Sequence, residues 1–263
     1  MPMTQTSHSS AATRSAARTA LVTGSTSGIG AATARALAAA GYLVVVTGRD
    51  VERGKKVVAD IEAADGSAAF VRSDLAADPN ELRVFAAEAV AAAGGQLDVV
   101  VHNAAVCIPK DTPGLTDADL AATLNVNIRA PHVLTAALAP AMAERGSGTI
   151  VVIGSWMAEI GHPFVGLYSA SKAAETELAR CWASEFGPKG IRVNTIAPGA
   201  TRTPINDDAE DAIAALGAKT PARRPGTPDD IAAAVTWIVS DQANYVHGAV
   251  LAVDGGISET YPY

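Results

Sequence analysis

Short apolar segments alternate along the chain with longer segments that are rich in alanine. The short segments carry many β-branched residues, which is typical of strands buried on both faces of a sheet. Alanine favours helix and lets helices pack close to a sheet. We expect strands over Thr19–Thr23, Tyr42–Thr47, Ala69–Arg72, Leu97–Val101, Gly148–Ile153, Ile191–Ile196 and Ala249–Val253.

The longer segments between these strands predict helices. They are expected over Ala31–Ala40, Val51–Ala64, Pro79–Ala93, Thr116–Arg145, Ser169–Phe186 and Pro228–Ser240. Such alternation indicates a parallel sheet wrapped by helices on both faces. The predicted fold class is therefore α/β, a doubly wound Rossmann fold with a seven-stranded parallel sheet, and residues 19–263 are expected to form one domain. Residues 204–226 break the rhythm with three prolines, so we expect a loop with one short helix over a pocket.

The first 18 residues differ from the rest of the chain. They are rich in serine, threonine and alanine and hold two arginines but no acid. A transit peptide and a disordered leader both have this composition, and we expect a disordered leader. No apolar run reaches the roughly 18 residues that a membrane span needs, so a cytoplasmic protein without a membrane segment is expected.

Composition narrows the class of protein further. The 263 residues carry a formal net charge of −7, which argues against nucleic-acid binding, because phosphate contacts require a basic face. The two cysteines, Cys107 and Cys181, form no CxxC pair and have no histidines at ligand spacing. We therefore expect neither a metal site nor a disulfide framework.

A glycine-rich turn lies between the first predicted strand and the first predicted helix. Small residues there let the backbone approach a pyrophosphate, while the helix N-terminus supplies free N–H groups and a positive dipole. A tight turn without a ligand has the same local sequence, but a position at the start of a βαβ series favours a cofactor. The residues expected to bind it are Gly24, Ser25, Thr26, Ser27, Gly28, Ile29 and Gly30.

The TGxxxGIG spacing of this turn resembles the short-chain dehydrogenase/reductase family, and in particular its carbonyl reductases of the 3-oxoacyl carrier-protein reductase type. Further matches follow in order, over roughly residues 19–258, each on the expected element. They are Asp74-Leu75, Asn103-Ala104-Ala105, Ser155, Tyr168 with Lys172 as YxxxK, Pro198-Gly199 and Val253-Asp254-Gly255-Gly256. Several matches in order are far more specific than any one of them.

The resemblance implies a nicotinamide cofactor held by several of these turns. Beyond the glycine-rich turn, the implied contacts are Asp74, Leu75, Asn103, Ala104, Tyr168, Lys172, Pro198, Gly199, Thr201 and Thr203. Asp74 matches the family's adenine contact, and Thr203 the position that binds the nicotinamide carboxamide. Two departures concern the turn after the fourth strand, where Ala105 replaces the usual glycine and His102 a common asparagine. We expect His102 to be a hydrogen-bonded histidine without a catalytic role.

Tyr168 and Lys172 lie four residues apart on a predicted helix and therefore share one face. A free tyrosine has a pKa of about 10, and a nearby ammonium favours the phenolate and lowers that pKa. Tyr168 can then act as general acid in ketone reduction or as general base in alcohol oxidation. Ser155 would donate a hydrogen bond to the substrate oxygen, on which charge grows as hydride arrives.

Asn127 completes the catalytic set by resemblance, because it matches a family position that holds a water for proton relay. Asn125 competes for this role two residues earlier, but the Ile-Arg-Ala-Pro sequence after Asn127 favours Asn127. A buried asparagine that only caps a helix is the alternative.

The residues after the second strand predict the coenzyme. An acid there binds the 2′-hydroxyl of the adenosine ribose, whereas an arginine pairs with a 2′-phosphate. Gly48 stands where NAD enzymes of the family carry aspartate, and Arg49 follows. We expect NADP(H) to be preferred and NAD(H) to remain possible, since Asp50 could turn inward or hold Arg49.

The substrate is expected to be a medium-sized, partly apolar ketone or secondary alcohol. Its predicted contacts are Ser155, Trp156, Phe164 and Tyr168, although the two apolar residues could instead pack against a partner subunit. The resemblance also implies a homotetramer or dimer. The alternative from another class is a catalytically silent NAD(P)-binding sensor with the same fold, but the presence of both Tyr168 and Lys172 favours the enzyme.

Overall fold

The computed structural model describes residues 17–204 and 209–260. The predicted leader lies outside these residues apart from its last two positions. Seven strands are present: β1 (Thr19–Val22), β2 (Leu43–Gly48), β3 (Ser67–Arg72), β4 (Val99–His102), β5 (Gly148–Ile153), β6 (Ile191–Pro198) and β7 (Val250–Val253). They form one sheet in the order β3-β2-β1-β4-β5-β6-β7, with every pair parallel. The predicted doubly wound α/β fold is confirmed.

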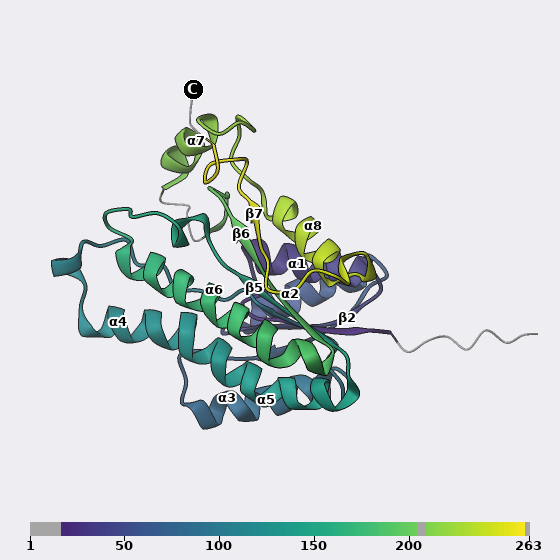
Figure 1. Ribbon diagram of the computed structural model, residues 1–263. Helices are drawn as coiled ribbons and strands as arrows, with labels where there is room; N and C mark the ends of the chain where they lie inside the picture. The colour runs from purple at the N-terminus through teal and green to yellow at the C-terminus, as the bar shows by residue number, and fades with distance from the viewer. Residues whose placement is uncertain (1–16, 205–208, 261–263) are drawn as a thin grey trace, which may run out of the picture.

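Helices cover both faces of this sheet (Figure 1). They are α1 (Gly28–Ala39), α2 (Val51–Glu62), α3 (Pro79–Ala92), α4 (Asp117–Leu124), α5 (Ala130–Arg145), α6 (Gly166–Phe186), α7 (Glu210–Ala218) and α8 (Pro228–Val239). Residues of α1, α2 and α8 pack on one face, and residues of α3, α5 and α6 on the other. None of the helices in the described part of the chain is long and apolar enough to cross a membrane.

Two apolar layers, one on each side of the sheet, form the core. Leu21 belongs to the layer under α3, α5 and α6, whereas Ala20 and Val22 beside it belong to the layer under α1 and α8. Successive side chains of a strand point to opposite faces, so both faces need apolar residues. This explains why the strands read as unbroken apolar runs.

The long helix predicted over Thr116–Arg145 is wrong as one element. It is divided into α4 and α5 by a π-helical turn, η2 (Asn125–Arg129), in which Ala130 N–H bonds to the carbonyl of Asn125. Pro131 explains the division, because a proline ring collides with the carbonyl four residues earlier and offers no N–H. The turn places the predicted catalytic Asn127 in a locally widened backbone.

Smaller differences concern element ends and one loop. Helix α6 begins at Gly166 rather than Ser169, and α1 at Gly28 rather than Ala31. The region predicted as a loop with one short helix contains α7, while residues 205–208 lie outside the described part.

Candidate active site

The parallel strands bring distant segments to one edge of the sheet. Because all seven run the same way, the turns that follow them meet at their carboxyl ends, where ligands bind in open α/β sheets. The glycine-rich turn follows β1, the Asn103 turn follows β4, Ser155 follows β5, and Gly199 follows β6. The sequence motifs, although far apart along the chain, therefore lie together at one edge of the sheet.

The glycine-rich turn has the shape that a pyrophosphate needs. Gly24 and Gly28 have φ values of +63° and +53°, in the region that favours glycine. A Cβ on Gly30 would lie 2.5 Å from the amide nitrogen of Asn103, so only glycine fits there. Ser27, the N-cap of α1, makes no side-chain cap hydrogen bond. The N–H groups of the first turn of α1 are thus left for a ligand.

Thr203 and Pro204 lie over this turn. A Cβ on Gly28 would stand 3.5 Å from Thr203 Cβ and 3.5 Å from Pro204 Cδ. Thr201 is more buried and donates its hydroxyl to the carbonyl of Gly199 at 2.9 Å. The segment after β6 therefore adjoins the phosphate-binding turn, as a cofactor lying across both requires.

Asn103 joins the turns after β4 and β1. Its side-chain nitrogen donates to the carbonyls of Thr23 at 2.9 Å and Gly24 at 3.2 Å. The hydroxyl of Thr23 accepts from the backbone N–H groups of Asn103 and Ala104 at 2.9 and 3.1 Å. Ser25 is fully buried and ties β1 to β2, because it donates to Val22 O and accepts from Thr47 N. Ser25 and Asn103 therefore shape the turn with their side chains.

Tyr168 and Ser155 lie on neighbouring elements above the end of β5. Tyr168 is half-buried on α6, and Ser155 is buried at the start of the short turn η3 (Trp156–Ala158). The pKa of Tyr168 is raised above its ordinary value of 10.0, because burial outweighs the Lys172 ammonium and the Ser155 hydroxyl, which both lower it. The expected net lowering of this pKa is therefore wrong, although Lys172 acts in the expected direction. The Ser155 hydroxyl also accepts from Met157 N at 3.1 Å, so this serine caps η3 as well.

Lys172 is almost fully buried, one helical turn after Tyr168 on α6. Its ammonium donates to the carbonyl of Ile153 at 2.8 Å and to Glu175 Oε2 at 2.7 Å. Glu175 was not among the site residues predicted from the sequence. The signal was present, since this acid stands three residues after Lys172 on the helix face that the other buried residues of α6 share.

Asn127 is fully buried in the π-helical turn and connects three segments. Its amide oxygen accepts from Val106 N at 2.8 Å, and its nitrogen donates to Val106 O and to Ser171 Oγ, both at 2.9 Å. Ser171 directly precedes Lys172 on α6. Of the two competing asparagines, Asn127 therefore lies beside the Lys172 segment, whereas the Asn125 side chain makes no such bond within the described part of the chain.

His102 is buried at the end of β4 and hydrogen-bonded, with Nε2 2.9 Å from Thr135 Oγ1. Burial, and secondarily the Lys172 charge, lower the pKa of His102 to about 3. It is therefore neutral at physiological pH.

Arg49 is exposed directly after β2, whereas Asp50 is engaged elsewhere. Asp50 caps α2 by accepting from Arg53 N at 3.0 Å and forms an ion pair with Arg53 Nε at 3.2 Å. In the structure Asp50 therefore neither turns inward nor pairs with Arg49.

Similar known proteins identify the family of this chain. A family model described as enoyl-(acyl carrier protein) reductase matches residues 24–258. A cis-4-hydroxycyclohexanecarboxylate dehydrogenase of Sinomonas cyclohexanicum is 36% identical over 245 residues, covering 92% of this chain and 96% of that protein. The chain belongs to the short-chain dehydrogenase/reductase family. It is an oxidoreductase of that family.

Two further members of the family are similar over nearly their whole length. A 3beta-hydroxysteroid dehydrogenase 1 of Eggerthella lenta is 36% identical over 250 residues, covering 93% of this chain and 95% of that protein. A gluconate 5-dehydrogenase of Burkholderia cenocepacia, solved in complex with NADP and tartrate, is 30% identical. It superposes with a TM-score of 0.87 over 93% of this chain and 96% of its own.

Some predicted contacts of this short-chain dehydrogenase/reductase differ from expectation in their surroundings. Leu75 packs its side chain into the core layer under α3 and α5, so only its backbone remains for the cofactor. Trp156 is 9% exposed and also belongs to the core. Phe164 is 56% exposed and has a positive φ of 69°. Trp156 and Phe164 therefore differ sharply in their access to a substrate.

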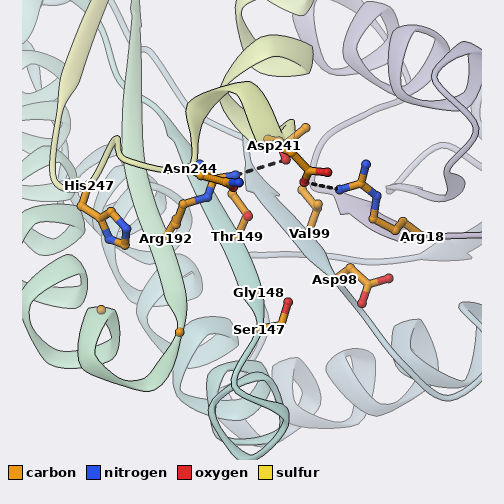
Figure 2. A pocket seen from close by; sticks show the side chains of 13 residues that line it. Arg18, Asp98, Val99, Ser147, Gly148, Thr149, Arg192, Asp241, Asn244 and His247 are labelled. Carbon is orange, nitrogen blue, oxygen red and sulfur yellow. Dashed lines mark hydrogen bonds and ion pairs between the residues drawn. The ribbon is translucent and has the colours of Figure 1, made fainter.

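A cavity of about 370 Å³ lies at the opposite edge of the sheet, at the amino ends of β4 to β6 (Figure 2). Its charged lining is largely paired within the protein. Arg192 donates to carbonyls at the end of α8, including Ile238 O at 2.7 Å, and Arg18 forms an ion pair with Asp241 at 3.1 Å. This cavity is remote from the motifs of the family. Among the described residues, no group of three or more histidines, cysteines and acids could hold a metal ion.

Proposed function

We propose that this protein is an NADP(H)-dependent oxidoreductase that interconverts a secondary alcohol and a ketone, with Tyr168 as general acid–base. The observation that carries the proposal is that Tyr168 interacts with the Ser155 hydroxyl and with the buried ammonium of Lys172, one turn along α6, at the edge that holds the glycine-rich turn. When bound, the nicotinamide supplies or accepts the hydride. The chain's own residues handle the proton and the developing charge.

Ser155 and Tyr168 act on the substrate oxygen in this proposal. During ketone reduction, negative charge grows on that oxygen, and hydroxyl donors fixed beforehand stabilise it. Tyr168 gives its proton to the oxygen, and the Lys172 ammonium favours the phenolate that remains. In alcohol oxidation the same groups act in reverse. Asn127, bonded to Ser171 beside Lys172, is proposed to hold this part of α6 in place.

The residues of the glycine-rich turn and the segment after β6 are proposed to hold the cofactor. The preference for NADP(H) is supported by Arg49, which is exposed at the end of β2, and by the engagement of Asp50 with α2. Arg72 on β3, which was not among the residues predicted from the sequence, supports the same preference for NADP(H). Arg72 is in register with Gly48 on the neighbouring strand, and a Cβ on Gly48 would approach Thr26 of the glycine-rich turn. Because paired residues of parallel strands point to the same face, the Arg72 side chain extends toward the face on which Thr26 lies.

The substrate class is proposed to be a cyclic secondary alcohol or its ketone. The support comes from two relatives, a cis-4-hydroxycyclohexanecarboxylate dehydrogenase and a 3beta-hydroxysteroid dehydrogenase. A homotetramer or dimer is also proposed, because Leu120 and Leu124 of α4 are 43% and 38% exposed on one short helix. Exposed apolar patches of this kind commonly mark subunit contacts.

The first test is a fluorescence titration with NADPH and with NADH, followed by turnover assays on cyclohexanols, hydroxysteroids and their ketones. Tighter binding of NADPH together with turnover of one class supports the proposal. Tighter binding of NADH would overturn the coenzyme assignment. Tight cofactor binding with no turnover on any alcohol or ketone would favour the catalytically silent sensor.

A further inference from the structure

A buried carboxylate stands directly behind the proposed active site. Glu175 lies three residues after Lys172 on α6, and its Oε2 is 2.7 Å from the lysine Nζ. The two side chains are 0% and 2% exposed. An ion pair this deeply buried is costly to form, since both ions lose their hydration. It is therefore not explained by stability alone.

Only one oxygen of this carboxylate is engaged. Glu175 Oε1 is buried and has no hydrogen-bond partner among the described residues. An ionised carboxylate normally accepts several hydrogen bonds, so the charged form is poorly supported here. Burial accordingly raises the pKa of Glu175 to about 7, against the opposing effect of the Lys172 ammonium. Glu175 thus changes its charge close to neutral pH.

The other ionisable groups around Lys172 do not change charge in this range. Lys172 faces Tyr168 on its own helix, Cys107 on the segment after β4, and His102 at the end of β4. Burial raises the pKa of the Cys107 thiol and of the Tyr168 phenol, and lowers the pKa of His102 to about 3. All three are therefore neutral near pH 7. Within this described cluster, Glu175 is the group that titrates there.

We propose that Glu175 is a positioning residue that holds the Lys172 ammonium and controls how strongly it favours the phenolate of Tyr168. An ammonium has three donors, and Glu175 and Ile153 O engage two of them. One donor remains for a further acceptor. When Glu175 is ionised, its charge partly cancels that of Lys172. When Glu175 is protonated, the full positive charge acts on Tyr168. This inference rests on the proposed function of Tyr168.

The test compares Glu175→Gln with the wild type. Glutamine keeps the size of the side chain and can still accept from Lys172, but it cannot carry charge. In Glu175→Gln we expect the alkaline rise of kcat for alcohol oxidation to move to lower pH by about one pH unit. The wild-type profile should also show an inflection near pH 7 from Glu175, and the variant should lack it. Glu177→Gln is the matched control, because Glu177 lies one half-turn away and pairs with Arg180 on the exposed face. It should leave the profile unchanged.

A second readout does not depend on turnover. The phenol of Tyr168 can be titrated by its absorbance near 295 nm, with Tyr168→Phe as the reference that removes its signal. The phenol should ionise at lower pH in Glu175→Gln than in the wild type. A wild type without oxidoreductase activity would overturn the proposed function and still leave this titration to decide the role of Glu175. An active wild type whose rate profile and phenol titration both match those of Glu175→Gln would overturn the inference.

If Glu175→Gln does not fold, carboxyl ¹³C NMR of the wild-type protein replaces it. A glutamate that titrates near pH 7, and that moves in Lys172→Met, supports the inference. Glutamates that all titrate below pH 5.5 or so contradict it.

Discussion

The side-chain nitrogen of Asn103 lies 2.9 Å from the carbonyl oxygen of Thr23, and it fastens the turn after β4 to the turn after β1. The same nitrogen donates to Gly24 O at 3.2 Å. One amide thus satisfies two carbonyls of the turn on which the proposed cofactor site depends. The shape of the phosphate-binding turn is therefore set partly by a residue about eighty positions later in the chain.

Asn103→Ala should weaken the protein and its cofactor binding together. The two carbonyls of Thr23 and Gly24 lose their donor, which costs about 1–3 kcal/mol of unfolding free energy. We expect a roughly tenfold rise in the Kd for NADPH, measured by fluorescence, together with a lower urea midpoint. Asn244→Ala, at the opposite edge of the sheet, is the control. Unchanged NADPH affinity in Asn103→Ala would contradict the assigned role.

Tyr168→Phe should separate chemistry from binding. The substitution removes only the hydroxyl that donates the proton, so kcat should fall by about 10²–10⁴-fold. The Kd for NADPH should change little, since Lys172 and the glycine-rich turn remain. Tyr245→Phe, at a fully exposed tyrosine, serves as the control. A Tyr168→Phe enzyme with near wild-type kcat would exclude Tyr168 as the general acid–base.

Arg49→Ala should reduce the preference for NADPH over NADH. A guanidinium paired with a 2′-phosphate contributes about 1.5–3 kcal/mol through charge-assisted hydrogen bonds, which corresponds to roughly a tenfold to hundredfold loss. NADH binding should be nearly unaffected. The ratio of the two Kd values is the measurement, and Arg180→Ala on the exposed face of α6 is the control. If Arg49→Ala keeps the ratio while Arg72→Ala lowers it, the 2′-phosphate contact belongs to β3.

His102 should make the protein less stable in acid. Its folded pKa of about 3 lies below the ordinary value of 6.5. Between pH 6.5 and about 3 the unfolded protein binds a proton at His102 more readily than the folded protein does. The stability that comes from keeping His102 neutral is therefore fully present above pH 6.5 and is lost as the pH falls toward 3. Over this window the unfolding free energy should fall by up to about 1.4 kcal/mol per pH unit. His102→Asn, which stays neutral, should flatten this slope in urea unfolding, whereas exposed His247→Asn should not. Equal slopes in wild type and His102→Asn would refute the assignment.

Much of the fold follows from local pattern, because buried parallel strands and the alanine-rich helices between them have distinct sequences. The seven strands were predictable for this reason, whereas the grouping of Ser155 with Tyr168 and Lys172 was expected only from the family resemblance. The break at Asn125–Arg129 was missed, since the helical pattern continues through it and only Pro131 marks it. The hydrophobic pattern alone did not indicate that the helix is interrupted before Pro131.

The electrostatic surroundings of the site were less predictable from the sequence. The three-residue spacing of Glu175 and Lys172 places the two residues on one helix face, but it does not show that both side chains are buried there. Leu75 was assigned to the cofactor by its place in a motif and Trp156 to the substrate as an apolar residue, yet tertiary packing buries both side chains. Asp50 was left open because its helix-capping bond and its possible ribose contact have the same sequence signature.

The π-helical turn η2 fixes the phase between α4 and α5. Such a turn contains one residue more than the α-helical turn it replaces. Each residue of an α-helix advances the side chain by about 100°. A chain shortened by one residue in α4 would thus rotate Asn127 away from Val106 and Ser171, even with every side chain of the site retained. The number of residues in this helical segment therefore matters to the site as much as their identity.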